Sequence, residues 1–331
     1  MQHSKTKNLR FDFSTSGNTN YATRINHHET TYMKAVIYER YGSADVLTLQ
    51  DIAKPVPKND EVLIRIHATS VTPGDWRMRK ADPFLARLFN GLFKPKRVKV
   101  LGFELAGVIE EVGKDVKSFK PGDAVFAFCG LRFGGYAEYQ CLRESAVIAL
   151  KPTNMTFEQA ATVPLGSLTA LSFLRRGKIA AGQKVLIYGA SGSVGTFAVQ
   201  LAKHFGTEVT TVCSTSNIDL VKSLGADKTV DYLKEDFTAL DVKFDIIFDA
   251  VGKTKKAIAQ KLLKPNGRYV SVNGQAKPTK QDLTFIKELI EADKLTSVID
   301  RTYSLDDIQN AHRYVEQFRK RGNVSVRVAT E

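Results

Sequence analysis

A short glycine-rich segment constrains the fold of this chain of 331 residues more than any other feature. It reads Gly189-Ala190-Ser191-Gly192-Ser193-Val194-Gly195, between an apolar β-branched run at 184–188 and an amphipathic stretch at 194–205. A strand, a glycine turn and a helix in this order form the context in which such a string binds a dinucleotide. We expect Gly189 to allow the tight turn, Gly192 to let the backbone approach a pyrophosphate, and Gly195 to permit close helix packing.

The residues around this turn predict the fold class. After residue 182, strand and helix patterns alternate, which is typical of an α/β, Rossmann-type, doubly wound parallel sheet. Before residue 150, short apolar strands follow one another without helices, which indicates a barrel-like, mostly antiparallel β unit. Strands are expected at 34–38, 62–66, 107–112, 124–126, 184–188, 208–213, 228–231, 244–249 and 268–272, and helices at about 156–162, 168–176, 194–205 and 218–224.

Composition excludes several classes of protein. Hydrophobic residues make up 43% of the chain and charged residues 25%, as in a globular protein with two domains, and no apolar run is long enough for membrane insertion. The formal charge is +13, but the basic residues are dispersed, so we expect a solvated surface and no nucleic-acid partner. The three cysteines, Cys129, Cys141 and Cys213, form no close pair, which favours a reducing cytoplasm and excludes a four-cysteine zinc lobe.

The first 32 residues differ from the rest. They are rich in Asn, Thr, Ser and His and show no periodicity, so we predict a disordered extension over 1–32. Two alternatives remain, a targeting presequence and a dispensable segment before a functional start at Met33.

The end of the second expected strand indicates which dinucleotide binds. A protein that binds NAD usually carries Asp or Glu there, to hold the ribose hydroxyls. This sequence has Cys213-Ser214-Thr215-Ser216-Asn217, which offers neutral donors and no carboxylate to repel a 2′-phosphate. The sequence therefore favours NADPH, although no Arg or Lys stands at this turn.

From Met33 to about Val328 the chain resembles the medium-chain dehydrogenase/reductase superfamily, and within it the zinc-free quinone oxidoreductase (zeta-crystallin-like) branch. The resemblance implies a GroES-like catalytic domain at 33–157 and 300–331, an NADP-binding Rossmann domain at 158–299, and a homodimer. The motifs that carry it are Ser70-Val71-Thr72-Pro73-Gly74-Asp75-Trp76, Leu101-Gly102-Phe103-Glu104-Leu105-Ala106-Gly107, Phe119-Lys120-Pro121-Gly122-Asp123, Gly134-Gly135-Tyr136-Ala137-Glu138-Tyr139, Val163-Pro164-Leu165-Gly166-Ser167-Leu168-Thr169-Ala170 and Ser223-Leu224-Gly225-Ala226-Asp227.

The resemblance also implies which residues contact the cofactor. Thr169 would lie beneath the nicotinamide, Ser214 and Asn217 near the 2′-phosphate, and the segment 321–323 over the cofactor; many relatives have Lys at Asn217 and at Asn323. The full set is Thr169, the turn from Gly189 to Gly195, Cys213, Ser214, Asn217, Tyr232, Val251, Gly252, Val272, Asn273 and Asn323.

Two substitutions remove the zinc site of the related alcohol dehydrogenases. Thr72 stands where those enzymes have Cys, and Phe103 where they have His; Glu104 remains, but one carboxylate does not make a site. We therefore expect no metal.

The same motifs supply the expected substrate pocket, formed by Thr72, Asp75, Trp76 and Tyr136. Trp76 would stack on a planar acceptor or pack in the core, and Tyr136 would donate a proton or pack. His67 is interpreted as a structural histidine rather than a proton donor, and His204 and His312 as surface residues. The apolar stripe within 77–98 is interpreted as lining the substrate cleft, with a membrane-surface helix as the alternative.

These features predict an enzyme that passes a hydride from NADPH to a quinone or an α,β-unsaturated carbonyl without zinc. No single side chain need be indispensable, so no catalytic residue is named. The alternatives are a reductase of enoyl thioesters and a non-catalytic NADPH-binding protein that acts through RNA or a protein partner.

Overall fold

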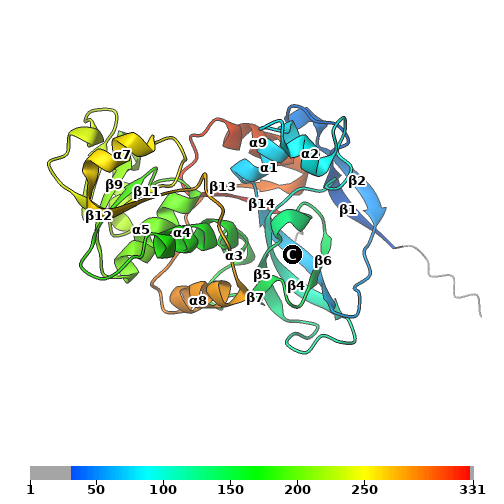
Figure 1. Ribbon diagram of the computed structural model, residues 1–331. Coiled ribbons are helices and arrows are strands. Elements are labelled where there is room, and N and C mark those ends of the chain that lie inside the picture. The colour runs from blue at the N-terminus through cyan, green and yellow to red at the C-terminus, as the bar shows by residue number, and fades with distance from the viewer. Residues whose placement is uncertain (1–30, 329–331) are drawn as a thin grey trace, which may run out of the picture. The chain divides into compact units, whose positions relative to one another are not determined.

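The computed structural model describes residues 31–328 (Figure 1). The first two strands form a separate antiparallel hairpin, in which Tyr32 pairs with Ala53. Because Tyr32 belongs to the first of these strands, the predicted disordered extension over 1–32 ends at least one residue too late. Residues 1–30, on which the rest of that prediction falls, lie outside the described residues. The hairpin consists of β1 (Tyr32–Ile37) and β2 (Thr48–Ala53).

A parallel sheet of five strands occupies the middle of the chain, with the strand order β10-β9-β8-β11-β12. The first four strands along the chain have the limits that the sequence predicts, whereas β12 begins earlier than expected. The α/β prediction is confirmed. The strands are β8 (Lys184–Tyr188), β9 (Glu208–Cys213), β10 (Lys228–Asp231), β11 (Phe244–Asp249) and β12 (Leu263–Ser271).

Helices cover both faces of this sheet because successive side chains of a strand point to opposite sides. Val185 and Ile187 pack in the core formed with one group of helices, whereas Leu186 packs on the other side in the core that includes Ala259. The first group is α4 (Pro164–Arg176), α5 (Ser193–His204), α6 (Ile218–Ser223) and α8 (Lys280–Glu291), and the other side is covered by α7 (Lys256–Leu262).

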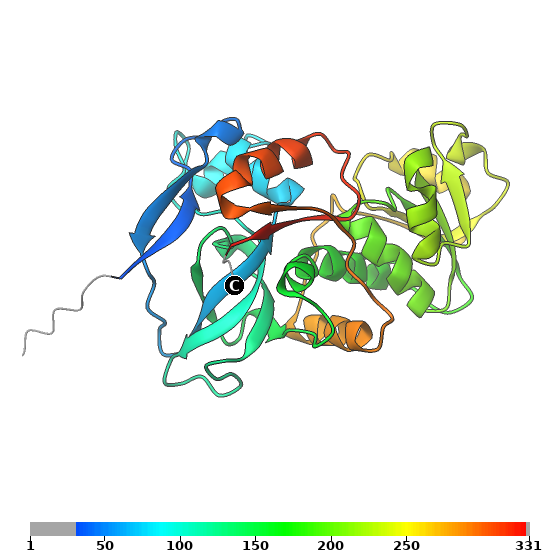
Figure 2. The same cartoon turned by 180° about the vertical axis from the view of Figure 1, so that it is seen from behind.

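The second large sheet has seven strands and is mostly antiparallel, in the order β13-β14-β3-β4-β5-β7, with β6 also paired to β3. The strand β14 near the end of the chain pairs with β3, so the chain returns to this antiparallel sheet after forming the parallel one (Figure 2). The strands are β3 (Glu61–Ser70), β4 (Glu104–Val112), β5 (Ala124–Phe128), β6 (Tyr139–Arg143), β7 (Val147–Leu150), β13 (Ile299–Ser304) and β14 (Asn323–Arg327).

Four further helices accompany the antiparallel sheet. The apolar stripe within 77–98 forms two short helices and a loop, and five of its large side chains are exposed rather than buried against a cleft. In the described part of the chain, no helix has the length and apolar character that a bilayer crossing requires. The helices are α1 (Pro73–Lys80), α2 (Ala86–Asn90), α3 (Phe157–Ala161) and α9 (Ile308–Glu316).

Candidate active site

Two glycines of the turn after β8 are required by the packing of the protein itself. Gly189 has φ +77°, and a Cβ built on it would lie 2.0 Å from Cγ2 of Val251. A Cβ on Gly195 would lie 2.2 Å from the carbonyl oxygen of Gly189. Another residue at Gly195 would force the backbone apart, and one at Gly189 would be strained by its positive φ and would displace the side chain of Val251.

Gly192 has a different reason to be glycine. Its φ is −82°, which any residue adopts, and the nearest atom to an added Cβ is 3.6 Å away. Nothing in the described protein therefore requires glycine here. Gly192 is the N-cap of α5, where unpaired backbone N–H groups attract an anion. Space beside a helix N-terminus, kept free of a side chain, fits the pyrophosphate of a dinucleotide.

The loops after β11 and β12 lie beside this turn. Asp249, the fully buried last residue of β11, accepts backbone hydrogen bonds from Val251 at 3.0 Å and Gly252 at 2.7 Å. The side-chain amide of Asn273 then donates to the carbonyl of Gly252 at 3.0 Å. The structure thus brings Gly189, Val251, Gly252 and Asn273 together at the carboxyl edge of the sheet, where parallel sheets bind their ligands. Sequence reasoning missed Asp249, although a carboxylate ending a buried strand was a visible signal.

The end of β9 forms the other side of the turn. The amide of Asn217 donates to the hydroxyl of Ser191 at 3.1 Å and to that of Ser214 at 3.0 Å. Thr215 donates to Asp231, a carboxylate at the end of β10 that the sequence analysis did not consider. Hydrogen bonds from Thr215 lower the pKa of Asp231, so this carboxylate stays charged beside the proposed 2′-phosphate position.

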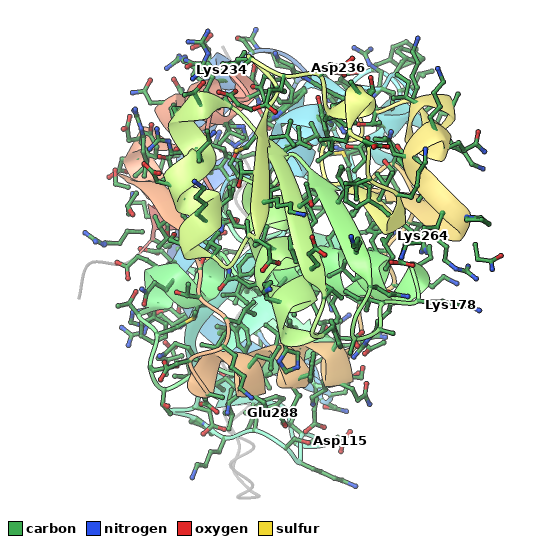
Figure 3. The ribbon with its side chains drawn as sticks, turned by 90° about the vertical axis from the view of Figure 1, so that its left-hand side faces the viewer. Asp115, Lys178, Lys234, Asp236, Lys264 and Glu288 are labelled. Atoms are coloured by element: carbon green, nitrogen blue, oxygen red, sulfur yellow. The ribbon has the colours of Figure 1, made fainter. Side chains whose placement is uncertain are left out.

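The turn after β10 lies at the same edge of the sheet. Tyr232 is half exposed there, and Lys234 and Asp236 follow it at the top of the view in Figure 3. Cys213 is the buried last residue of β9, and Val272 directly follows β12. The strand ends therefore gather the predicted cofactor residues along one edge.

The chain's return strand touches the glycine turn. The backbone N–H of Gly322 donates to the carbonyl of Ser191 at 2.8 Å, and Gly192 and Gly322 form a parallel bridge. Asn323 is buried, and its amide donates to the carbonyl of Val298 at 3.1 Å. In this structure the backbone at 322, rather than the side chain of Asn323, approaches the turn.

A cavity of about 260 Å³ lies next to these loops. The rings of Phe103 and Phe128 lie nearly parallel on its wall, 6.4 Å apart between centroids. Thr169 on α4 also lines the cavity. None of the lining residues is charged; they are Phe103, Phe128, Gly130, Leu131, Leu165, Leu168, Thr169, Gln275, Ala276 and Pro278. Most of them were missed by sequence reasoning, although Leu165 and Leu168 belong to the motif that contains Thr169.

Phe103, one of the two positions where the zinc enzymes have a ligand, lines this cavity, whereas Thr72 does not. Phe103 packs on Phe133 at 4.3 Å, and Glu104 is buried, accepting from the hydroxyl of Ser70 and from the backbone N–H of Leu165 at 2.6 Å. Burial raises the pKa of Glu104 to about 7. Residues 31–328 contain no group of three or more His, Cys, Asp or Glu residues arranged to hold a metal ion.

Two of the expected pocket residues face the protein interior instead of the cavity. Asp75 is fully buried and accepts from the Thr72 hydroxyl at 2.7 Å, from the Thr72 N–H at 2.9 Å and from the Gly102 N–H at 2.9 Å. Burial raises the pKa of Asp75 to about 6. Tyr136 is also fully buried, and its hydroxyl lies 3.2 Å from Nε2 of His312. These two residues order the helix start and the core, and the single O–H of Thr72 is already donated.

The remaining candidates are also packed. Trp76 is 6% exposed and meets Phe318 edge to face at 5.7 Å. His67 stacks on Phe157 at 4.2 Å, in keeping with a structural histidine. The expectation that His312 lies on the surface was wrong: α9 turns it inward, and burial lowers its pKa well below the ordinary value.

Two known domain families match separate parts of the chain. Residues 58–152 match the alcohol dehydrogenase GroES-like domain, and residues 193–317 match the family described as zinc-binding dehydrogenase. The chain is 37% identical to 2-methylene-furan-3-one reductase of Solanum lycopersicum and 35% identical to the chloroplastic NADPH-dependent alkenal/one oxidoreductase of Arabidopsis thaliana; each alignment covers 89% of this chain and 79% of the relative. The structure of the quinone oxidoreductase from Coxiella burnetii superposes with a TM-score of 0.80 at 30% identity, covering 90% of this chain and 100% of that one.

Proposed function

Because this chain belongs to the medium-chain dehydrogenase/reductase superfamily, among its quinone and alkenal oxidoreductases, we propose that it reduces quinones or α,β-unsaturated carbonyls by hydride transfer, without zinc. The observation that carries the proposal is the uncharged cavity lined by Phe103, Phe128 and Thr169, with Gln275 from the loop after β12. In a zinc enzyme the position of Phe103 would hold a ligand; here it is an aromatic wall.

The uncharged lining of the cavity determines which substrates it suits. An alcohol must lose its hydroxyl proton as its hydride leaves, and that step needs a cation such as zinc to stabilise the alkoxide. A conjugated acceptor needs no such deprotonation, and the charge that develops on it is spread over several atoms. The parallel rings of Phe103 and Phe128 suit a flat, apolar acceptor. The chain positions this acceptor, while a bound nicotinamide dinucleotide supplies the hydride.

We propose NADPH as the dinucleotide. The support is the neutral cluster of Ser214, Asn217 and Ser191, which is linked by hydrogen bonds. No carboxylate stands at the carboxyl end of β9, where the strand closes with Val212 and Cys213. The carboxylate of Asp231 already accepts hydrogen bonds from Thr215 and from the Leu233 N–H at 3.1 Å, so its oxygens are engaged within the turn after β10. The proposal includes the cofactor residues that the resemblance implies. It also includes a catalytic domain at 33–157 and 300–331, a dinucleotide-binding domain at 158–299, a homodimer and a cytoplasmic location.

The proposal is tested by following the hydride itself. Protein treated with a chelator, and checked for zinc by elemental analysis, is incubated with an enone and NADPH that carries deuterium at C4. Deuterium at the β-carbon of the product, with an undiminished rate after chelation, is the expected result. Stoichiometric zinc whose removal abolishes turnover would contradict it.

A further inference from the structure

The segment that connects α1 to β4 exposes apolar side chains that nothing in the described protein covers. Their exposed fractions are 62% for Phe84, 67% for Leu85, 72% for Leu88, 46% for Leu92 and 86% for Phe93. We call these five residues the 84–93 patch. Monomeric proteins seldom expose so many large apolar side chains within ten residues, and such clusters mark interaction surfaces.

The patch is held in place by the rest of its own segment. The amide of Asn90, which is 1% exposed, donates to the hydroxyl of Tyr38 at 2.7 Å and accepts from the backbone N–H of Val98 at 2.6 Å. Phe89 packs toward the core, and Tyr41 donates to the carbonyl of Gly91 at 2.7 Å. These inward-facing residues fix the conformation of the loop, so the five exposed side chains of the patch are held in defined positions on the surface.

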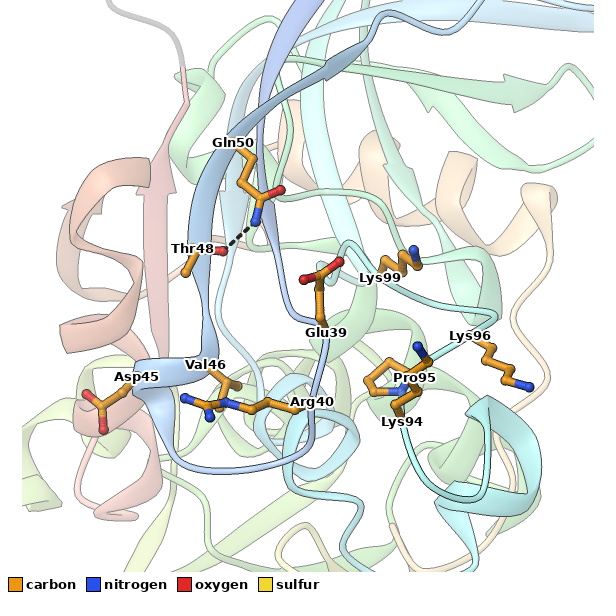
Figure 4. Close-up of a pocket in the computed structure, with 10 residues that line it drawn as sticks. All are labelled: Glu39, Arg40, Asp45, Val46, Thr48, Gln50, Lys94, Pro95, Lys96 and Lys99. Carbon is orange, nitrogen blue, oxygen red and sulfur yellow. Dashed lines mark hydrogen bonds between the residues drawn. The ribbon is translucent and has the colours of Figure 1, made fainter.

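Basic residues follow the patch directly. Lys94, Lys96 and Lys99 are exposed and lie along one stretch of chain, at the rim of a hollow of about 690 Å³ that also contains Arg40, Glu39 and Asp45 (Figure 4). Asp45 is paired with Arg313. Within residues 31–328, none of the three lysines has an ion-pair partner, so their charges are available to an anionic surface.

We propose that the 84–93 patch and its lysines bind the interface of an anionic lipid bilayer, with Phe and Leu side chains among the acyl chains and Lys94, Lys96 and Lys99 at the headgroups. Exposed Phe and Leu beside Lys or Arg is the combination by which peripheral proteins bind such surfaces. A second copy of this chain fits less well, because a two-fold interface would set the unpaired lysines of one patch against those of the other. RNA fits less well too, since bases stack on aromatic rings and three of the five patch residues are leucines.

Vesicle binding by the full chain tests the proposal without reference to any enzyme activity. The protein is titrated with vesicles of phosphatidylcholine alone and of phosphatidylcholine with phosphatidylserine. We expect binding to the anionic vesicles that weakens as salt is added, and little binding to the neutral ones. Absence of binding to both, or equal binding to both, would overturn the proposal.

Two double variants, each with a matched control, distinguish binding through the patch from the general attraction of a basic protein to anionic vesicles. Leu88→Ser with Phe93→Ser should weaken binding roughly tenfold or more, and Lys94→Gln with Lys96→Gln by about fivefold per lysine. The matched controls are Val56→Ser with Leu150→Ser, and Lys114→Gln with Lys120→Gln in the loop that Asp115 marks at the bottom of Figure 3. The controls should bind like the original protein, and all four should keep its melting temperature because the altered side chains are exposed.

Three results would contradict the proposal. If the Lys114 and Lys120 pair weakens binding as much as the Lys94 and Lys96 pair, the attraction is not local. If the Leu88 and Phe93 pair binds vesicles normally, the patch is not the lipid contact. If sedimentation shows a dimer that the Leu88 and Phe93 pair dissociates, a second copy covers the patch.

Discussion

The backbone N–H of Gly322 donates a 2.8 Å hydrogen bond to the carbonyl of Ser191, and this contact joins the residue before β14 to the glycine turn after β8. The residues of this contact are 131 positions apart, yet both belong to the proposed cofactor site. Gly322 has φ +64°, and a Cβ on it would lie 2.3 Å from the carbonyl oxygen of Val298. The geometry of the turn therefore depends on a glycine from the end of the chain.

Gly322→Ala should lower both stability and cofactor affinity, because the strained backbone and the contact with Val298 push the segment away from Ser191. We expect a loss of about 2–4 kcal/mol in the free energy of unfolding. Gly182→Ala is the control: its φ is +77° and nothing lies within 4 Å of an added Cβ. It should cost only about 1 kcal/mol and leave the cofactor dissociation constant unchanged. Normal affinity in Gly322→Ala would show that the contact does not shape the site.

Ser214→Asp should weaken NADPH binding about tenfold or more, because a carboxylate would face the 2′-phosphate at the end of β9. NADH binding should change little or improve. Dissociation constants for both dinucleotides measure the effect, and Thr284→Asp on α8 controls for the added charge. Tighter binding of NADH than of NADPH by the unaltered protein would refute the proposed cofactor preference.

Glu104→Gln should remove a pH dependence of stability. Burial raises the folded-state pKa of Glu104 from 4.5 to about 7, although the nearby charge of Lys320 opposes the shift. As the pH rises through this window the unfolded chain loses its proton first, so the free energy of unfolding falls between about pH 4.5 and 7. The contribution is roughly 1–3 kcal/mol.

The glutamine can still accept from the Leu165 N–H through its oxygen and donate to the Ser70 hydroxyl, so the fold should survive. Urea unfolding at both ends of the window should give the variant a smaller decrease than the original protein. Equal decreases in the two proteins would mean that Glu104 titrates normally.

Much of the parallel sheet was predictable because local signals agree there. The strands from β8 to β11 are apolar and β-branched, and Gly189 to Gly195 carry their own backbone requirements. The antiparallel sheet was predictable in type, but the burial of its polar residues was not. Asp75, Tyr136 and His312 come from three separate elements, and only tertiary packing sets them against one another.

The cavity at Phe103 was the least predictable part of the candidate site. Its wall combines Phe103, just before β4, and Phe128, the last residue of β5, with Leu165 from α4 and Gln275 from a loop after β12. No sequence spacing predicts that these distant residues line the same cavity. The stripe within 77–98 was misinterpreted for the opposite reason, because helical spacing of apolar residues does not show which face the fold leaves uncovered.

A chain that begins at Met33 should keep the melting temperature and turnover of the full chain. Met33 is buried, and it and the residues after it in β1 retain their pairing with β2; only the pair of Tyr32 with Ala53 is lost. Thermal unfolding of the two chains side by side is the measurement. A decrease of several degrees would mean that the preceding residues pack on the fold.

The central claim is that the cavity at Phe103 serves conjugated acceptors and not alcohols, and one comparison tests it most directly. NADPH absorbance is followed with a quinone, a short enone, an enal and an enoyl thioester, and NADP reduction is followed with short alcohols. The account predicts turnover of the quinone, the enone or the enal, and no measurable oxidation of the alcohols. Rapid alcohol oxidation with no activity toward any conjugated acceptor would contradict it.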